Sequence, residues 1–254
     1  MTRYDVYLEV SESGTSMAHV LQLPGCAAGG ASLDEAMVNV VTAIGEYYDW
    51  LDRHGDPASD GTSAITIELA EISQGVGPFQ RGDKAALFGP DREPLSREEL
   101  ETCLRYAGYS RRELLDLTRH LPDDVLDWRY DGDGPHAHDA MTIREILRHT
   151  GNAEEWFASR LVHPDRLPVQ WQDDQHLPVF EFLEMERRTV TALLRELTDE
   201  EREAVMYPTW FTDHPDEPWT ARKALRRLLE HEREHTRHVS EILVAWNERK
   251  VTTP

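Results

Sequence analysis

The chain has only two cysteines, Cys26 and Cys103, among 254 residues. Two cysteines cannot build the disulfide framework of a small secreted domain. No run of eighteen apolar residues occurs either, so we expect no membrane span and no membrane association. The opening residues 1–10 lack the apolar core of a signal peptide. These absences together predict a cytoplasmic protein.

Lysine is scarce as well, with three residues in the whole chain, and the formal net charge is −21. Such a field repels phosphate backbones, so we expect no nucleic-acid partner. Residues 1–75 are especially acidic: Arg3 and Arg53 are their fixed cations, against twelve carboxylates. This acidic surface is either a solubilising coat or a docking face for a basic protein, and the sequence leaves both open.

The first 75 residues read as a small α+β domain. Polar and apolar residues alternate over 3–10 and 17–22, which predicts two strands, and a weak third strand precedes a helix. Ser32 and Glu35 form a capping box at the start of that helix. Alternation returns over 64–72 as a closing strand. The predicted order is β-β-β-α-β.

The rest of the chain carries helical periodicity. Residues 76–95 are rich in Gly and Pro and are predicted to be a linker. Apolar residues then recur at three- and four-residue steps in four stretches, over about 96–121, 142–161, 178–197 and 219–250. We therefore predict an N-terminal domain over 1–75, a linker over 76–95 and an all-α bundle over 96–254.

Histidines lie on the apolar stripe of the last predicted helix. His231, His235 and His238 share a face with Leu228 and Ile242. Each histidine alone is explained by burial with hydrogen bonds or by an exposed polar face. Burying several imidazoles together is costly, and a divalent cation removes that cost by taking neutral ring nitrogens as ligands.

A third nitrogen ligand is available on another predicted helix. His149 lies on the inward stripe of the helix over 142–161, three residues after Ile146. One histidine from this helix and two from the last give three ligands with an open position. That arrangement is typical of a catalytic rather than a structural zinc site.

These motifs resemble a known family. RHTGNAEEWF (148–157) and LLEHEREHTRHVSEIL (228–243) resemble the DinB-like, YfiT-like four-helix bundles. The resemblance implies an up-down four-helix bundle that binds a divalent metal through His149, His231 and His235. We predict zinc or nickel as that metal, because imidazole suits both. The resemblance also implies a small-molecule enzyme, and some members use low-molecular-weight thiols such as bacillithiol or mycothiol as co-substrates.

Other residues near this predicted site carry no settled role. His238 stands where the family usually has Gln or another polar residue, and it is either a fourth ligand or part of the cavity wall. Trp156, Trp171 and Trp210 either form walls of a pocket over the metal or cover the ends of the bundle. We assign no catalytic acid or base from the sequence.

The N-terminal domain has its own resemblance. YDVYLEV, LPGC and SLDEAMVNVVTAIGEYYDWL resemble the HicB-like antitoxin domain. The resemblance implies a partial double-stranded-RNA-binding fold without RNA binding. We expect this domain to bind a protein partner or a second copy of the chain, with strand 64–72 or 3–10 as the exposed edge.

Two functions of different classes follow. The first is a metal-dependent enzyme, a thiol-dependent S-transferase or isomerase of an unidentified small molecule. The second is a non-catalytic, metal-stabilised binding protein whose acidic N-terminal domain docks a partner. An open site at the metal favours the enzyme, and a metal sealed by side chains favours the binding protein.

Overall fold

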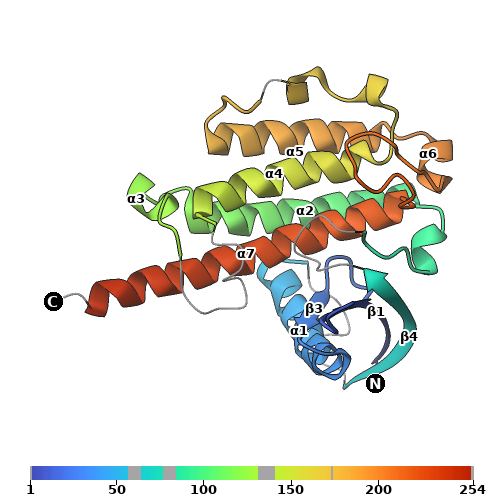
Figure 1. Cartoon of the computed structure of the whole chain (residues 1–254), viewed down its shortest axis with the longest axis horizontal. Coiled ribbons are helices and arrows are strands. Elements are labelled where there is room, and N and C mark those ends of the chain that lie inside the picture. The colour runs from blue at the N-terminus through green and yellow to red at the C-terminus, as the bar shows by residue number, and fades with distance from the viewer. Residues whose placement is uncertain (1, 57–63, 77–83, 131–140, 173, 253–254) are drawn as a thin grey trace. The chain divides into compact units, whose positions relative to one another are not determined.

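The computed structural model describes residues 2–56, 64–76, 84–130, 141–172 and 174–252 (Figure 1). Contacts between residues divide the chain into two compact units. Unit 1 comprises residues 1–94 and 203–226, and unit 2 comprises residues 95–202 and 227–254. The predicted division into 1–75, 76–95 and 96–254 stays a prediction, because compact contacts alone do not show which segments fold independently.

Unit 1 contains a four-stranded sheet with the order β3-β2-β1-β4. Its strands are β1 (Thr2–Ser11), β2 (Ser16–His19), β3 (Ala27–Gly30) and β4 (Ile65–Val76). β1 pairs antiparallel with β2 and parallel with β4, while β2 pairs antiparallel with β3. With α1 (Leu33–Arg53) between β3 and β4, the strand-helix order agrees with the sequence prediction.

The prediction of an exposed edge at strand 3–10 is wrong. β1 has a neighbour on each side, and its side chains Val6 and Leu8 have no exposed surface. Tyr7, which points to the opposite face from Val6 and Leu8, is buried as well, so both faces of the middle of β1 are covered. In the described part of the chain, β4 pairs with β1 alone and β3 pairs with β2 alone, so these two strands are the edges of the sheet. The other strand predicted as the edge, 64–72, lies in β4.

Helix α1 begins where the sequence predicts. The Ser32 hydroxyl accepts a hydrogen bond from the backbone N–H of Glu35 at 3.2 Å. The Glu35 carboxylate accepts from the backbone N–H of Ala31, at 2.9 Å, so the reciprocal half of the capping box is displaced by one residue. The buried face of α1 includes Val40, Ile44 and Tyr47.

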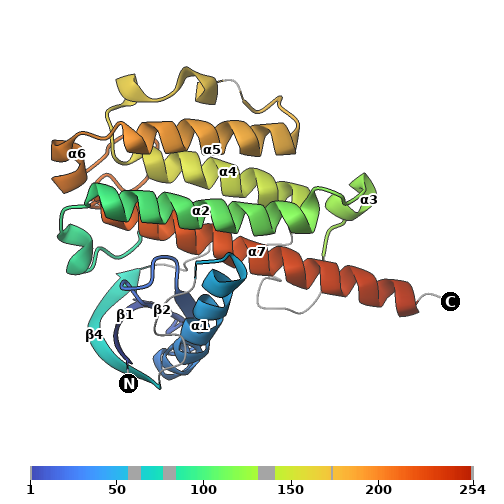
Figure 2. The same cartoon turned by 180° about the vertical axis from the view of Figure 1, so that it is seen from behind.

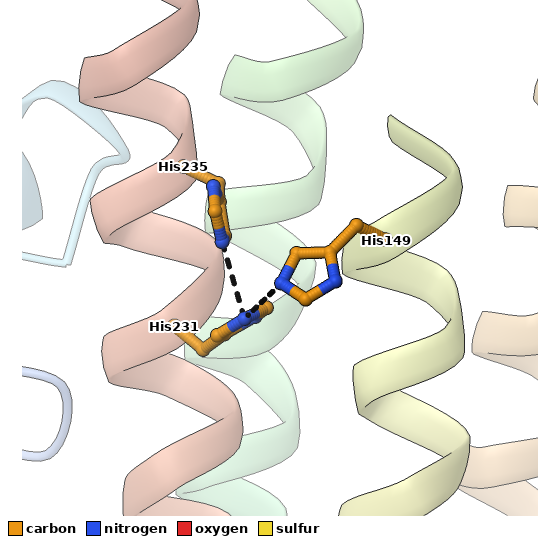
Figure 3. A group of neighbouring side chains, drawn as sticks. All are labelled: His149, His231 and His235. Atoms are coloured by element: carbon orange, nitrogen blue, oxygen red, sulfur yellow. Dashed lines mark hydrogen bonds between the residues drawn. The ribbon is translucent and has the colours of Figure 1, made fainter. Parts of the chain in front are cut away.

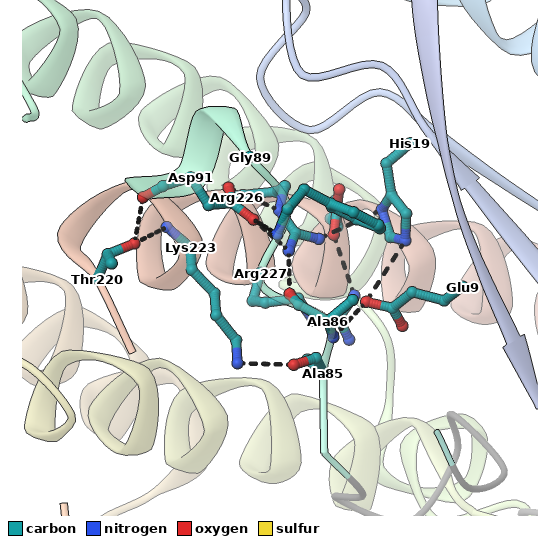
Figure 4. Close-up of polar contacts among 12 residues, drawn as sticks. Glu9, His19, Ala85, Ala86, Gly89, Asp91, Thr220, Lys223, Arg226 and Arg227 are labelled. Carbon is teal, nitrogen blue, oxygen red and sulfur yellow. Dashed lines mark hydrogen bonds and ion pairs between the residues drawn. The ribbon is translucent and has the colours of Figure 1, made fainter. Parts of the chain in front are cut away.

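Buried charged groups join distant segments within unit 1 (Figure 4). The carboxylate of Glu9, on β1, accepts from the backbone N–H of Ala86 at 2.7 Å. Arg226 donates to the carboxylate of Asp91 at 2.9 Å, and Lys223 donates to the carboxylate of Glu217 at 2.8 Å. Residues 84–94 of the predicted linker are thus packed in unit 1, and its residues 77–83 lie outside the described part.

Unit 2 is helical (Figures 1 and 2). Its long helices are α2 (Arg97–Thr118), α4 (Ile143–Ser159), α5 (Val179–Arg195) and α7 (Ala221–Thr252), whose first turns belong to unit 1. Short helices complete the described elements: α3 (Asp123–Leu126), α6 (Asp199–Glu203), η1 (Pro90–Arg92, in unit 1), η2 (Pro164–Arg166) and η3 (Val169–Gln172). The helical character of this part is as predicted, while the up-down order stays a prediction.

An apolar core holds the helices of unit 2 together. It includes Leu114, Ile146, Phe182, Val239 and Ile242, which are fully buried. These residues recur on the predicted stripes of α2, α4, α5 and α7, so the 3.6-residue period of the sequence determines which face each helix buries.

Two predicted helix starts are confirmed in detail. Ser96 and Glu99 form a complete capping box before α2, and Thr142 and Glu145 form one before α4. In each box the hydroxyl accepts from a backbone N–H, and the glutamate accepts from the backbone N–H of the capping residue. None of the described helices is both long and apolar enough to cross a membrane.

Candidate metal centre

Three histidine rings converge between two helices of unit 2 (Figure 3). His149 comes from α4, and His231 and His235 come from α7. The Nε2 atoms of His231 and His149 are 3.0 Å apart, and those of His235 and His231 are 3.1 Å apart. Two nitrogens that bind one zinc ion tetrahedrally at 2.0–2.1 Å are roughly 3.4 Å apart. Small ring movements therefore suffice to admit an ion.

The helical geometry explains this convergence. A four-residue step advances α7 by about 6 Å along its axis and rotates it by about 40°, so His231 and His235 point to the same side. Their helix is oriented by the buried Val239 and Ile242 in the core. His149 follows the buried Ile146 by three residues, so α4 turns it toward α7.

The electrostatics of the group favour neutral rings. Burial among the helices lowers the pKa of His231 well below its usual range, and His235, His149 and Arg227 lower it further. A neutral imidazole has the free lone pair that a metal ligand needs. His149 is exposed, and His231 and His235 are partly exposed. The group therefore fits a metal ion that solvent can reach from one side.

A small pocket adjoins His231. It is lined by residues of α4, α5 and α7: Thr150, Glu154, Phe157, Arg187, Leu228, His231 and Glu232. The side chains that line it nearly touch, and they leave no space for even a water-sized molecule. It is therefore a packed crevice, and binding of any group in it requires these side chains to move.

Buried ion pairs form one wall of that pocket. Arg111, from α2, donates to Glu232 at 2.5 Å and to Glu154 at 2.7 Å. Arg187, from α5, lies 2.7 Å from Glu154 and 2.6 Å from Glu232. Although burial raises the pKa of Glu232, Arg111 and Arg187 together lower it below its usual range. The two positive charges of the arginines thus balance the two negative charges of the glutamates among the four helices.

This network positions the histidines. Glu154 is on the same helix as His149, and Glu232 is the neighbour of His231 in the chain. Arg111 contacts both carboxylates, and it also donates to the backbone oxygen of Leu183 on α5 at 2.7 Å. One guanidinium therefore fixes the distance between the helices that carry the three histidines.

Comparison with known proteins agrees with this arrangement. A family model described as the DinB superfamily matches residues 108–239, which is more than half of the chain. The chain belongs to the DinB superfamily. The matched residues include His149, His231 and His235.

This DinB-superfamily chain is also similar to one solved structure. That protein is YfiT from Bacillus subtilis, described as "a probable metal-dependent hydrolase with an unusual four-helix bundle topology". The alignment has 20% identity and a TM-score of 0.44, and covers 65% of this chain and 94% of that chain. A similarity this low assigns no function. A search of curated proteins found no match.

The other residues predicted near the site are placed as follows. His238 is buried, with its ring centroid 6.1 Å from that of His235, and it is outside the group of three converging nitrogens. Trp156 contacts Phe157, and it is Phe157 that packs against His231 at 5.7 Å between ring centroids. Their roles as ligand or wall stay predictions.

The two remaining tryptophans lie elsewhere. The indole N–H of Trp171 donates to the Thr189 hydroxyl at 2.9 Å, which attaches the segment before α5 to that helix. Trp210 belongs to unit 1. Neither residue lines the pocket beside His231, so their assignment to a pocket wall also stays a prediction.

Sequence reasoning missed the buried charged residues of this DinB-superfamily bundle. A signal for them was present, because they occupy the apolar stripes. Arg111 lies four residues after Ala107 and three before Leu114, and Glu232 lies four residues after Leu228. A charged residue at such a position must find a buried partner, so a stripe interrupted by opposite charges on different helices predicts an ion pair.

Proposed function

We propose that this protein is a metal-dependent enzyme of the DinB superfamily, with His149, His231 and His235 as the ligands of one zinc or nickel ion. The observation that carries the proposal is the convergence of three ring nitrogens, all within 4.8 Å of one another, from two helices. Imidazole suits both metals. A bound ion would lower the pKa of a thiol or water at its open position.

The reaction that we propose is thiol-dependent, an S-transfer or an isomerisation on a small molecule. The exposed side of His149 leaves room for a thiol to approach the site from solvent. Glu154 and Glu232 are held by two arginines, so they serve to position the helices rather than to accept a proton. Arg187 and Thr150 line the crevice beside His231, which has no space for a substrate group, so we place the substrate at the exposed side of His149.

The rival function is a non-catalytic, metal-stabilised binding protein with an acidic N-terminal partner site. The exposure of His149 favours the enzyme, because a purely structural metal is usually enclosed by four protein ligands. Among the described residues, three nitrogens rather than four make up the histidine group.

The test begins with metal analysis of protein purified without a histidine tag. We expect about one equivalent of zinc or nickel in the wild type, and loss of that metal in His235→Ala. His120→Ala, which changes an exposed histidine outside the group, is the matched control. Full metal occupancy in His235→Ala would rule out this ligand set.

The activity is then tested with the metal-loaded protein. Bacillithiol and mycothiol are supplied with electrophilic small molecules, and thiol consumption is measured in the wild type and in His235→Ala. Metal-dependent thiol transfer supports the proposal. Metal binding without thiol transfer or isomerisation, across a broad panel of substrates, would instead support the binding protein.

A further inference from the structure

A second group of metal-ligand side chains lies in unit 2, and it consists of carboxylates alone. Glu155 comes from α4, Glu186 comes from α5, and Asp174 lies in the segment between η3 and α5. One oxygen of each residue lies within 4.8 Å of the others. Glu186 is 0% exposed and Asp174 is 1% exposed, while Glu155 is half-buried.

Several of these oxygens lack an ordinary hydrogen-bond donor in the described structure. No N–H or hydroxyl group donates there to either carboxylate oxygen of Glu186, to Oδ2 of Asp174 or to Oε1 of Glu155. These carboxyl groups face one another instead, and Glu155 is the hydrogen-bond partner of Glu186 and of Asp174 when it holds a proton. Leaving a buried polar atom unsatisfied costs about 1–3 kcal/mol, and more for a charged group. Acceptors that face only one another require either shared protons or a positive ligand.

Three arginines of unit 2, Arg111, Arg148 and Arg187, form their ion pairs and hydrogen bonds with groups other than these carboxylates. Arg111 and Arg187 are matched by Glu154 and Glu232, as described above. Arg148 donates to backbone oxygens, to that of Leu177 at 2.6 Å and that of Asp174 at 3.4 Å. Its guanidinium also stacks over the Phe182 ring at 4.1 Å. The charge of Arg111 lowers the pKa of Glu186, but in the described part of unit 2 these three arginines form no ion pair with the three carboxyl groups.

Protons are one way to compensate them. Burial raises the pKa of Glu155 to about 10, with Glu186 and Asp174 adding to the effect. Burial likewise raises the pKa of Glu186 to about 8, and the charges of Glu154 and Asp174 act in the same direction. In the absence of a cation, both glutamates therefore hold protons at neutral pH.

We propose that Glu155, Asp174 and Glu186 form a second divalent-cation site, built for a hard ion such as Mn²⁺, Mg²⁺ or Ca²⁺. Such ions prefer carboxylate oxygens, whereas zinc and nickel favour imidazole. Oxygens that share one ion at 2.0–2.6 Å lie within roughly 4–5 Å of each other, which the cluster satisfies. On binding, the ion displaces the protons of Glu155 and Glu186 to the buffer.

This site has a structural consequence that is independent of the proposed enzyme activity. It joins α4 to α5 and to the segment that carries Asp174. Residues 160–178 connect α4 to α5, and Asp174 lies in the second half of this connection. An ion bound by Asp174, Glu155 and Glu186 therefore holds that half of the connection against α4 and α5.

In the test, metal-free full-length protein is titrated with Mn²⁺. The electron paramagnetic resonance signal of the free ion reports how much Mn²⁺ stays unbound at each step. His235→Ala is the background, so that the histidine group does not contribute. We expect one Mn²⁺ per chain at pH 8. Glu186→Gln in the same background should weaken binding at least about tenfold, since even outer partners of metal ligands contribute that much. Glu181→Gln, an exposed position of the same helix, is the matched control and should bind like the background.

A second variant and a second readout guard against misfolding. Asp174→Asn changes the segment rather than a helix, and it should weaken binding in the same direction. Calorimetric titration in two buffers of different ionisation enthalpy should show proton release on Mn²⁺ binding. Unchanged Mn²⁺ stoichiometry and affinity in both variants would overturn the proposal, as would absence of binding up to about 1 mM in the background.

Discussion

The guanidinium of Arg111 donates to the carboxylate of Glu232 at 2.5 Å, from α2 to α7, one residue away from His231. Both side chains are buried, with 7% and 2% of their surfaces exposed. The contact links the charge balance of the bundle to the position of its histidines, because the same guanidinium also holds Glu154 on the helix of His149.

Replacing Arg111 should be strongly destabilising. In Arg111→Met, Glu154 and Glu232 lose one of two cationic partners while staying buried. Breaking such a buried pair costs about 3–5 kcal/mol, and urea unfolding should show a loss of this size in Arg111→Met. Arg119→Met, which removes an exposed pair with Glu184, should cost less than about 1 kcal/mol. Equal effects of the two substitutions would contradict the role assigned to Arg111.

Two glycine substitutions should act in opposite directions. A Cβ added at Gly151 would lie 2.3 Å from Cε1 of Phe182, a ring that is fully buried and cannot yield freely. Overpacking of this kind costs about 1–3 kcal/mol, so Gly151→Ala should lower the melting temperature. Gly108→Ala, in α2, meets nothing within 4 Å and should raise it, because Ala favours a helix over Gly by about 1 kcal/mol. An unchanged melting temperature in Gly151→Ala would mean that α4 and α5 are farther apart at Gly151 than this structure places them.

The acidic cluster should make stability depend on pH. The folded pKa of Glu186, about 8, lies above its ordinary value of 4.5, so the folded state holds a proton that the unfolded state releases. Its contribution is fully present below about pH 4.5 and is lost as the pH rises through about 8. In that window each such proton changes the free energy of unfolding by about 1.4 kcal/mol per pH unit.

Thermal unfolding in EDTA checks this expectation. The wild type should lose stability between pH 5 and pH 8 relative to Glu186→Gln, whose amide does not titrate and can donate to the remaining carboxylates. In the His235→Ala background, adding Mn²⁺ at pH 8 should stabilise the protein with Glu186 more than the one with Glu186→Gln, because the intact carboxylate site gains more binding energy. Parallel pH profiles for the two proteins would show that Glu186 does not hold a proton.

The acidic surface of unit 1 should reject duplex RNA. Arg3, one of two fixed cations in residues 1–75, already pairs with Glu68 at 2.9 Å and lies 3.5 Å from Asp5. In gel-shift assays at low salt, we expect no binding of the full chain to duplex RNA. Salt-sensitive binding at micromolar concentration would contradict this.

The open edge of β4 is the surface that we propose for a protein partner or a second copy of the chain. Leu69 and Ile72 on this strand are 40% and 41% exposed. Leu69→Lys should therefore weaken self-association or capture of a basic protein, measured by light scattering and pull-down. A wild-type protein that stays monomeric and binds no basic protein would leave the acidic surface as a solubilising coat.

The sequence by itself determined the helices of unit 2, several of their starts and the histidine set. Hydrophobic periodicity and capping boxes are local signals, since they depend on residues three or four positions apart. His149, His231 and His235 were chosen because imidazoles on an apolar stripe require a partner. Metal binding by these residues stays a proposal, but their convergence in space is observed.

Only the tertiary structure decided which charged residues meet. Glu154 and Glu155 are neighbours in the chain, yet one pairs with Arg111 and Arg187 while the other faces two carboxyl groups. Adjacent residues on a helix point about 100° apart, so each meets different elements, and those elements come from distant parts of the sequence. The same holds for β1, whose two neighbouring strands are placed by pairing across the sheet and not by its own alternation. Long-range pairings of this kind have no local signature, because their energy depends on what the fold brings near.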